Sequence, residues 1–493
     1  MMELLRIRLK SSNWLSAIFK HSKWYLLASL ATKAMGFLLL PLYTQYLTPT
    51  DYGILTSLEV INYLLPFFFS FALVSAFDRF YHQKTGNSRY LSTLFSTILF
   101  FVLAAGTAVV TLVIISSYFW MPHFLEVPAY PYALLGFLPT LLTEISLLGF
   151  AFFRQSLQAK KVSLILISSA LVNIVISLWL VVGQEMGVLG RLWGNLGASV
   201  LSFVAVLWYA HKNQLIKFVV DRPLLRNCLR YSVPLIPLAA SSWINVFSDR
   251  LIIGQYVGID AVGIYSIAFH ISMILYFVGE SIVQVLVPMI MSGLEKREIS
   301  IKNKLSDYNY YLWSLLLFGS LVACFFAQPI INYFLDPAFG ETAAIIPILC
   351  LAITFQMSHR LYGQLINYHK RTRIFMVGAL ISAGLNILLN LLLVPKYGYL
   401  AAAYTTLGVS IFYAVFVVGW SRQLEAVGLP HWKYLVGAAL VLVLVIFPKI
   451  IPNNFISGIG LLSIFSGIIF YTVYHQSLDS FKTARRIATV DEA

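Results

Sequence analysis

The stretch Ser241–Ile264, SSWINVFSDRLIIGQYVGIDAVGI, is mostly apolar, yet it carries Asp249 and Arg250 side by side in its middle. Its second part has a counterpart 210 residues earlier, because residues 45–54 (QYLTPTDYGI) align without a gap on residues 255–264 (QYVGIDAVGI). Two further windows, 187–199 and 398–410, match at an offset of 211. The chain is therefore predicted to contain two copies of one unit, a plan that recurs among transporters.

The composition indicates an integral membrane protein. Of 493 residues, 59% are apolar and only 11% are charged, whereas soluble domains carry about 25% charged residues. Apolar segments long enough to cross a hydrocarbon core of about 30 Å recur along the whole chain. The three cysteines show no metal-ligand spacing and predict no disulfide framework. The first apolar segment lacks a following cleavage site, so we expect it to remain as a helix.

Hydropathy predicts an all-α fold with about 14 transmembrane helices, arranged as two six-helix parallel repeats plus two C-terminal helices. The first repeat (24–210) is predicted to contain helices 24–46, 52–78, 91–117, 130–153, 162–183 and 187–210. The second repeat (231–420) is predicted to contain helices 231–257, 262–290, 307–332, 342–366, 374–395 and 399–420. The two additional helices, 433–451 and 455–475, make up the segment 433–475.

Three polar segments complete the chain. Residues 1–23 are basic and predict an interfacial segment on an anionic membrane surface. Residues 211–230 predict a cytoplasmic amphipathic linker, with Arg222, Arg226 and Arg230 on one face; a plain tether between the repeats is the alternative. Residues 476–493 form a tail that is predicted to be cytoplasmic.

The distribution of Lys and Arg predicts the orientation in the membrane. These residues gather in alternate loops and at both ends of the chain, while the opposite loops hold only Lys396 and Lys449. By the positive-inside rule, both termini are expected in the cytoplasm and the number of spans is even. The same bias accounts for most of the net charge of +14, so the charge does not point to a nucleic-acid partner.

Charges within the predicted spans are the candidates for function, since each costs about 2.5–3.5 kcal/mol on insertion scales. Lys33 lies roughly 14 Å into the first span and Arg250 roughly 11 Å into the seventh, at 1.5 Å per residue. These two helices are equivalent in the repeat, so both cations are candidate substrate-binding residues. Asp249 is expected in a structural pair that joins neighbouring helices, because adjacent residues do not face each other on a helix.

Five further charges lie within the predicted spans. Glu280, Glu144 and Glu59 are candidate sites for a coupling ion, H+ or Na+, with a structural ion pair as the alternative for Glu280. Arg360 is a candidate contact to a substrate headgroup, although its side chain is also placed to snorkel to the membrane surface. Arg191, one turn from the outer surface, is expected to snorkel.

Enzyme motifs are missing from the sequence. It contains no phosphate-cradling glycine-rich loop, no His-Glu-x-x-His motif and no paired His or Cys spacing. We therefore predict no catalytic residue, no metal site and no bound cofactor.

The predicted number, grouping and orientation of the helices resemble those of a known family. Fourteen helices as six plus six plus two, with cytoplasmic termini, resemble the MOP flippase superfamily, which has a MATE-like fold. Residues 36–61 (GFLLLPLYTQYLTPTDYGILTSLEVI) and 248–266 (SDRLIIGQYVGIDAVGIYS) resemble its polysaccharide-transporter branch, the Wzx-type oligosaccharide flippases. The run from Asn386 to Ala403 resembles that branch as well.

This resemblance implies a function and partners. It implies translocation of undecaprenyl-diphosphate-linked oligosaccharide units across the inner membrane by alternating access, for O-antigen, capsule or exopolysaccharide. It implies that Lys33 lies among cationic residues of a central cavity and that Asp249 and Arg250 form the family's Asp-Arg signature. The expected partners are the lipid-linked oligosaccharide, membrane lipids, glycosyltransferases and a polysaccharide polymerase. The chain has few other cations at depth, which leaves the charge of the glycan open.

Three alternatives remain open. A peptidoglycan lipid-precursor flippase and a multidrug cation antiporter share the same fold, and an antiporter would favour buried carboxylates over a buried lysine. A membrane-embedded polysaccharide polymerase belongs to another class and usually needs a sizeable outer loop. The longest predicted outer loop, about residues 118–129, is too short to house much.

Overall fold

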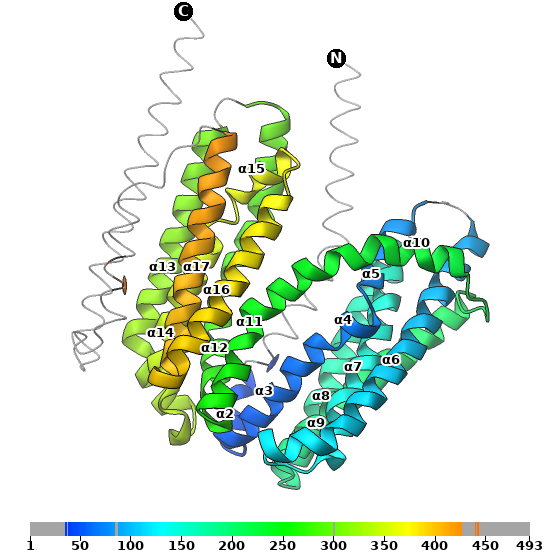
Figure 1. The fold of residues 1–493 in the computed structure, drawn as a ribbon, viewed down its shortest axis with the longest axis horizontal. Helices are drawn as coiled ribbons and strands as arrows, with labels where there is room; N and C mark the ends of the chain where they lie inside the picture. Colours follow the sequence, from blue (N-terminus) through cyan, green and yellow to red (C-terminus); the bar gives the residue numbers. More distant parts are fainter. Residues whose placement is uncertain are drawn as a thin grey trace, which may run out of the picture. The chain divides into compact units, whose positions relative to one another are not determined.

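A computed structural model describes residues 35–83 apart from 37, residues 87–298 and 301–425, and residues 439, 441 and 442. All regular elements in these ranges are helices (Figure 1). Ten helical segments among the described residues are long and apolar enough to cross a membrane, which makes the chain a multi-pass membrane protein. The predicted segments 1–23 and 476–493, and nearly all of 433–475, lie outside the described residues, so the count of 14 remains a prediction.

The described chain divides into two compact units, and the division falls within helix α12, between Gly263 and Ile264. The first unit ends with the first turn of α12 (Ile259–Glu295). Before that turn it contains α2 (Leu40–Thr44), α3 (Pro49–Leu64), α4 (Pro66–Phe69), α5 (Leu73–Phe80), α6 (Ser88–Phe124), α7 (Ala129–Gln155), α8 (Ala159–Leu178), α9 (Gly187–Lys212), α10 (Arg222–Ser232) and α11 (Ile236–Tyr256).

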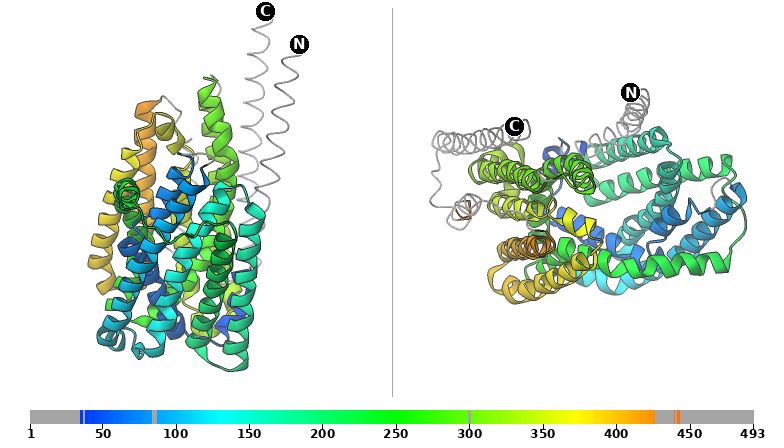
Figure 2. Two further views of the ribbon diagram at one scale, coloured as in Figure 1. Left: turned by 90° about the vertical axis from the view of Figure 1, so that its right-hand side faces the viewer. Right: turned by 90° about the horizontal axis from the view of Figure 1, so that it is seen from above.

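Helices α6 to α9 pack beside one another within the first unit, as the two views of Figure 2 show. A π-helical turn, Trp179–Gly183, extends α8, and a 3-10 turn, Val233–Leu235, joins α10 to α11. The second unit continues with α13 (Ile301–Phe334), α14 (Thr342–Ser358), α15 (Gly363–Tyr368), α16 (Arg373–Tyr397) and α17 (Tyr399–Leu424), with a 3-10 turn at Pro337–Phe339. Within it, α14 packs against both α13 and α17.

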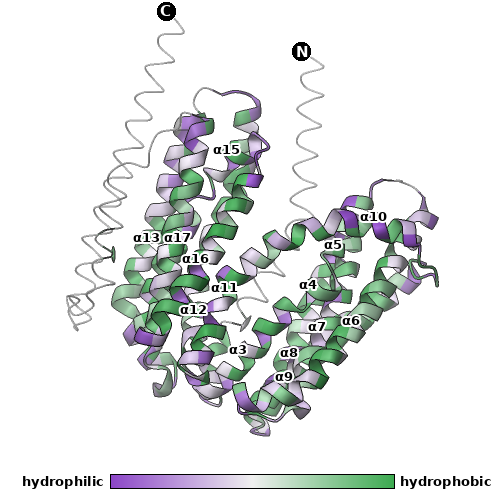
Figure 3. Ribbon diagram, in the orientation of Figure 1, coloured by the Kyte–Doolittle hydropathy of each residue, from purple (hydrophilic) through white to green (hydrophobic). Residues whose placement is uncertain are grey.

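Hydropathy follows this arrangement. Apolar residues cover most of the length of the long helices, and hydrophilic residues gather toward helix ends and connections (Figure 3). Because the apolar segments are helical, their backbone polar groups are hydrogen-bonded within the helix, as a bilayer requires.

Two helices that were predicted as continuous are interrupted in the structure. The predicted span 52–78 is divided into α3, α4 and α5, and Phe71 and Ala72 between α4 and α5 have φ angles of 49° and 56°. The predicted span 342–366 is divided into α14 and α15 by the turn at 359–362. Hydropathy averaged over about 20 residues detects the span, but it is insensitive to a break of three or four residues.

The linker forms an amphipathic helix whose apolar face contacts the bundle. In α10 the three arginines are exposed, while Cys228 is buried and Leu224, Leu225 and Leu229 pack on the core of the first unit. Burial raises the pKa of the Cys228 thiol to about 11, so this thiol stays protonated at neutral pH. Protein contacts thus occupy the apolar face of this amphipathic linker.

The segment before α10 is fixed to α6 by hydrogen bonds. Ser96 Oγ donates to the carbonyl of Leu215 (2.9 Å) and accepts from the amide of Lys217 (2.8 Å). The amide of Asp221 donates to Thr97 Oγ1 at 3.1 Å. These bonds satisfy the backbone of a non-helical segment that would otherwise lack partners.

The repeated motif packs against its own copy. Thr50 Oγ1 donates to Asp260 Oδ1 at 2.5 Å, and these two residues occupy equivalent positions of the repeat. The repeated glycines lie where the first turns of α3 and α12 meet. A Cβ atom on Gly53 would lie 2.0 Å from the carbonyl oxygen of Ile259, and one on Gly263 would lie 1.9 Å from that of Pro49. Only glycine allows this approach, because backbone atoms on the other side have no room to move away.

We expect Gly53→Ala and Gly263→Ala each to destabilise the protein by about 1–3 kcal/mol or more, the range for overpacking. The measurement is the thermal unfolding midpoint of purified protein in detergent. Gly408→Ala is the matched control, since Gly408 lies inside α17 with no atom within 4 Å of the added Cβ. Helix propensity predicts a gain there of up to about 1 kcal/mol. Unchanged midpoints for both Gly53→Ala and Gly263→Ala would contradict the contact.

Candidate functional site

Asp249 and Arg250 form a buried ion pair within α11. Arg250 Nη1 lies 2.9 Å from Asp249 Oδ1, and each side chain is 3% exposed. The same Nη1 donates to the carbonyl of Val246, and the guanidinium lies 5.5 Å from the ring centroid of Phe247. The expectation that these adjacent side chains cannot meet is wrong, because the long arginine side chain folds back along its own helix to reach the carboxylate.

Aromatic side chains join this part of α11 to α3. The ring of Phe247 stacks on Tyr63 with centroids 4.8 Å apart, and Trp243 Nε1 donates to the carbonyl of Val60 at 3.1 Å. Arg250 thus lies in a packed region, and Asp249 and Val246 of its own helix are among the groups that hold its guanidinium. Lys33, the other predicted cation, lies outside the described residues.

Arg360 and Glu280 are brought together in the second unit. Arg360 lies in the turn that separates α14 from α15, and its Nη2 is 2.6 Å from Glu280 Oε2 on α12. The side chains are 40% and 23% exposed, so the pair is accessible rather than sealed. A predicted headgroup contact and a predicted ion-coupling residue are therefore each other's partners here.

Glu144, on α7, contacts the interruption between α4 and α5 in the first unit. Ser70, between α4 and α5, donates its hydroxyl to Glu144 Oε1 on α7 at 2.5 Å. No ion pair joins Glu144 to a basic residue in the ranges that the structure covers. One turn away, Asn62 donates to the carbonyl of Gly136 (2.9 Å) and accepts from Thr140 (2.6 Å). Polar groups thus line the contact of α3 and α4 with α7.

The two interruptions occupy related places in the repeats. Glu280 follows Ser70 by 210 residues, which is the offset of the repeated motif. In both repeats the second predicted helix contacts the fourth through a carboxylate at an interruption. The first repeat places the interruption on the second helix, and the second repeat places it on the fourth.

Glu59 has no such partner among the residues that the structure describes. It is half-buried on α3, and no hydrogen bond or ion pair joins its carboxylate to another residue in the described part of the chain.

Arg191 is the polar residue whose position sequence reasoning missed. Its Nη1 donates to Asn173 Oδ1 (3.1 Å), and Ser177 Oγ and Tyr43 Oη each lie 3.4 Å away. Its guanidinium lies 4.5 Å from the Tyr43 ring centroid. The prediction that Arg191 snorkels to the surface is wrong, because these partners hold the side chain against α2 and α8. The signal in the sequence was Asn173, a polar residue inside an apolar span.

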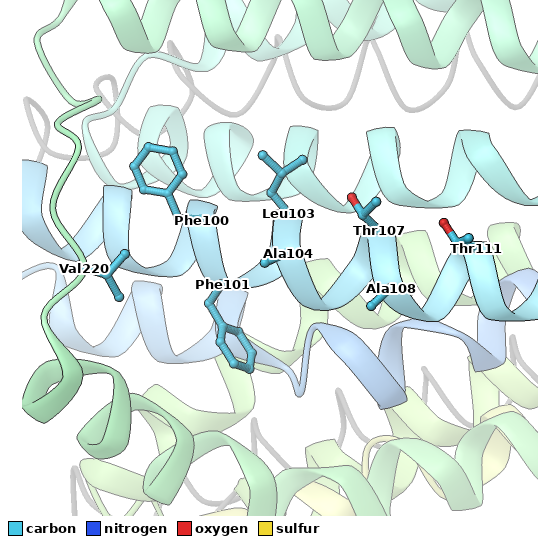
Figure 4. A pocket seen from close by; sticks show the side chains of 8 residues that line it. All are labelled: Phe100, Phe101, Leu103, Ala104, Thr107, Ala108, Thr111 and Val220. Carbon is cyan, nitrogen blue, oxygen red and sulfur yellow. The ribbon is translucent and has the colours of Figure 1, made fainter.

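Two cavities lined by described residues lie within the first unit. One, of about 590 Å³, is lined by residues of α2, α7, α8 and α9, including Arg191. The other, of about 880 Å³, runs along α6 and ends at Val220 (Figure 4). Its lining is apolar apart from Thr107 and Thr111, so it offers no group to bind a charged ligand. No group of three or more His, Cys, Asp or Glu side chains suited to a metal ion occurs among the described residues.

Comparison with known proteins gives one family and several relatives. Residues 18–294 match the model of the family described as "Polysaccharide biosynthesis protein". Two curated relatives come from Methanocaldococcus jannaschii. "Uncharacterized membrane protein MJ1068" is 26% identical, with 52% of this chain and 51% of that protein aligned. "Uncharacterized membrane protein MJ1375" is 26% identical, with 82% and 97% aligned. The chain thus spans about half the length of the first relative.

Solved structures share the fold. The structure "Lipid II flippase MurJ, inward closed conformation" is similar with a TM-score of 0.70, 17% identity, and coverage of 92% of this chain and 99% of that chain. An inward-facing "multidrug resistance MATE family transporter of the MOP superfamily" is similar with a TM-score of 0.66, 13% identity, and coverage of 80% and 95%. The predicted MATE-like membrane fold is confirmed by these similarities.

The Asp249–Arg250 pair can be tested by a double-mutant cycle. We expect Arg250→Gln and Asp249→Asn each to destabilise the folded protein by about 3–5 kcal/mol, because each removes one partner of a buried ion pair. The double variant should lose less than the sum, with a coupling energy of about 0.5–3 kcal/mol. Unfolding midpoints and the yield of folded protein are the measurements.

Arg154→Gln is the control for this cycle, since it breaks a single Arg–Asp pair whose side chains are 50% and 31% exposed. An exposed pair contributes only about 0–1 kcal/mol. Strict additivity of the Asp249 and Arg250 variants would show that the two charges do not stabilise each other.

Proposed function

This chain belongs to the polysaccharide biosynthesis protein family, and from that premise we propose that it is a flippase for lipid-linked oligosaccharides. The proposed substrate is an undecaprenyl-diphosphate-linked repeat unit, moved across the inner membrane by alternating access for O-antigen, capsule or exopolysaccharide synthesis. Family membership carries the proposal, and the fold shared with MurJ and MATE transporters supports it. We assign the chain a transport role without catalytic residues, and we place both termini in the cytoplasm because of the loop charges. A polymerase and glycosyltransferases are its proposed partners.

The proposed binding groups are the cations Lys33, Arg250 and Arg360. Arginine and lysine suit a diphosphate because charge-assisted hydrogen bonds to its oxygens are about twice as strong as neutral ones. Arg250 and Arg360 are each held by a carboxylate in this conformation. A diphosphate would therefore have to replace Asp249 or Glu280 as the partner of the arginine. Such an exchange keeps the arginine paired before and after binding, and it requires the displaced carboxylate to take up a proton, because an unpaired carboxylate in the membrane is costly.

We propose H+ as the coupling ion and Glu144 as the carboxyl group that carries it. Glu144 has a hydroxyl partner, whereas Glu280 is neutralised by Arg360. Protonation of Glu144 removes a charge from the membrane interior without leaving a cation unpaired, so this group can exchange a proton at lower cost than Glu280. Na+ is the other candidate ion, and it would need additional oxygen ligands around the same carboxylate.

One alternative function is supported by a specific observation. The structure with the TM-score of 0.70 is titled as a lipid II flippase, so transport of a peptidoglycan precursor is the second candidate. The two substrates share a polyprenyl diphosphate and differ in the attached sugars. The phenotype of cells that lack the protein distinguishes between these two proposals. Loss of the surface polymer alone supports the first proposal, and loss of cell-wall synthesis supports the second.

The cation proposal is tested by surface-glycan export per folded molecule in Lys33→Ala and Arg250→Lys variants. A lost charge-assisted contact of about 1.5–3 kcal/mol predicts a decrease of roughly 10- to 100-fold for Lys33→Ala. Arg250→Lys should be impaired less, since lysine keeps the charge and loses the bidentate fork. Lys396→Ala, at the last turn of α16, is the charge-matched control and should export normally. Normal export per molecule in Lys33→Ala would exclude Lys33 from substrate binding, and normal export in Arg250→Lys would exclude a bidentate contact of Arg250 with the diphosphate.

The coupling proposal predicts different outcomes for two carboxylates. Glu144→Gln should lower export by at least about tenfold with a normal level of folded protein, because glutamine keeps the hydrogen bond to Ser70 but cannot exchange a proton. Glu280→Gln should instead lower the level of folded protein, because Arg360 loses its counter-charge. Export in membrane vesicles is measured with an imposed proton gradient or sodium gradient. A response of the wild type to sodium alone, or full export by Glu144→Gln, would contradict proton coupling at this residue.

A further inference from the structure

The cavity of about 590 Å³ in the first unit has the dimensions of a ligand site, since small-molecule sites span about 300–1,000 Å³. Four of its lining residues carry hydroxyl groups that contact one another in pairs. Thr143 Oγ1 lies 3.3 Å from Ser199 Oγ, and Ser169 Oγ lies 2.7 Å from Ser202 Oγ. Helices α7, α8 and α9 thus present polar groups to a space inside one bundle.

Arg191 supplies the charge of this cavity. Its Nη1 is anchored by Asn173, Ser177 and Tyr43, as described above. Asn173 is fixed in turn, because its Nδ2 donates to Asn195 Oδ1 at 2.7 Å. No hydrogen bond joins the Nε or Nη2 of Arg191 to another of the described residues. The described residues therefore hold the Nη1 end of the guanidinium and make no hydrogen bond to its Nε–Nη2 edge. That edge is the one suited to a bidentate oxyanion.

No carboxylate among the described residues of the bundle neutralises the charge of Arg191. None of the ion pairs among the described residues includes Arg191. Arg154, which also lines the cavity, is by contrast paired with Asp78 at 2.9 Å. A half-buried cation without a carboxylate partner is unfavourable in a membrane, and a bound anion removes that cost.

We propose that this cavity is an anion-binding site of the first unit, and that its ligand carries a phosphate group held by the Nε–Nη2 edge of Arg191. Phosphate suits the site better than carboxylate because its oxygens point in several directions, toward polar groups on three helices. The group can come from a soluble phosphate or from the headgroup of an anionic phospholipid, which share this chemistry. The site lies within one unit and does not depend on the flippase function proposed above.

The test uses the full-length protein in a non-ionic detergent, with inorganic phosphate as the first probe and chloride at equal ionic strength as the reference. Binding to the folded state raises the unfolding midpoint as the ligand concentration exceeds Kd. We expect phosphate to raise the wild-type midpoint, and Arg191→Gln to weaken the apparent affinity at least tenfold. Arg297→Gln removes an exposed charge after α12 and should bind phosphate like the wild type.

A second experiment tests whether the bound phosphate group belongs to a phospholipid headgroup. Protein reconstituted in phosphatidylglycerol is transferred to the same detergent, and the retained lipids are counted by native mass spectrometry. Loss of one retained phosphatidylglycerol in Arg191→Gln, but not in Arg297→Gln, assigns the site to a headgroup. A phosphate effect without such a loss assigns it to a soluble phosphate.

The alternative is that Arg191 only braces α2, α8 and α9. In that case Arg191→Gln lowers the midpoint in chloride but leaves the phosphate-dependent increase unchanged and retains the same number of lipids, which would overturn the proposal. If Arg191→Gln does not fold, Arg191→Lys decides, because it keeps the charge and lacks the fork. Phosphate affinity and lipid retention equal to the wild type in Arg191→Lys would equally refute bidentate binding.

Discussion

A charge or a free polar group inside the apolar part of a bilayer has no water to bind, so the protein must supply its partner. This constraint organises the polar interior of both units. Arg250 is satisfied by Asp249 and Val246 of its own helix, and Arg360 by Glu280 across two helices. Glu144 is satisfied by a hydroxyl, and Arg191 by neutral oxygens and an aromatic ring. These arrangements differ in whether a charged group is paired with an opposite charge or bound only by neutral groups. We regard the groups bound only by neutral partners as the stronger candidates for proton or ligand binding.

The internal repeat shows how one geometry can carry two chemistries. Ser70 and Glu280 occupy equivalent positions, and each lies at a contact between the second and fourth predicted helices of its repeat. In the first repeat the contact holds a single carboxyl group, which suits reversible protonation. In the second repeat it holds an ion pair, which suits retention of charge. The close contact of Gly53 and Gly263 with backbone atoms of the opposite copy explains why glycine recurs in both motifs.

The proposed transport function rests on the same polar groups. A substrate diphosphate is an acceptor that can replace a carboxylate at an arginine, and a carboxyl group without a cation can exchange a proton. The interruptions at residues 70–72 and 359–362 lie beside these groups. Interrupted helices in transporters expose backbone groups to ligands at such places, so the arrangement supports a link between substrate binding and ion exchange.

The sequence by itself determined the class of fold, the positions of most spans and the repeated motif. These follow from local quantities, because bilayer thickness sets helix length and apolar runs mark each crossing. It also identified Asp249, Arg250, Glu144, Glu280 and Arg360 as costly charges. Only the tertiary structure decided their partners: Glu280 meets Arg360 from 80 residues away, Asp249 meets its own neighbour, and Arg191 turns inward to Tyr43 instead of snorkelling. Which side chains meet depends on how packed helices are rotated and where they are interrupted, and hydropathy carries no information on either.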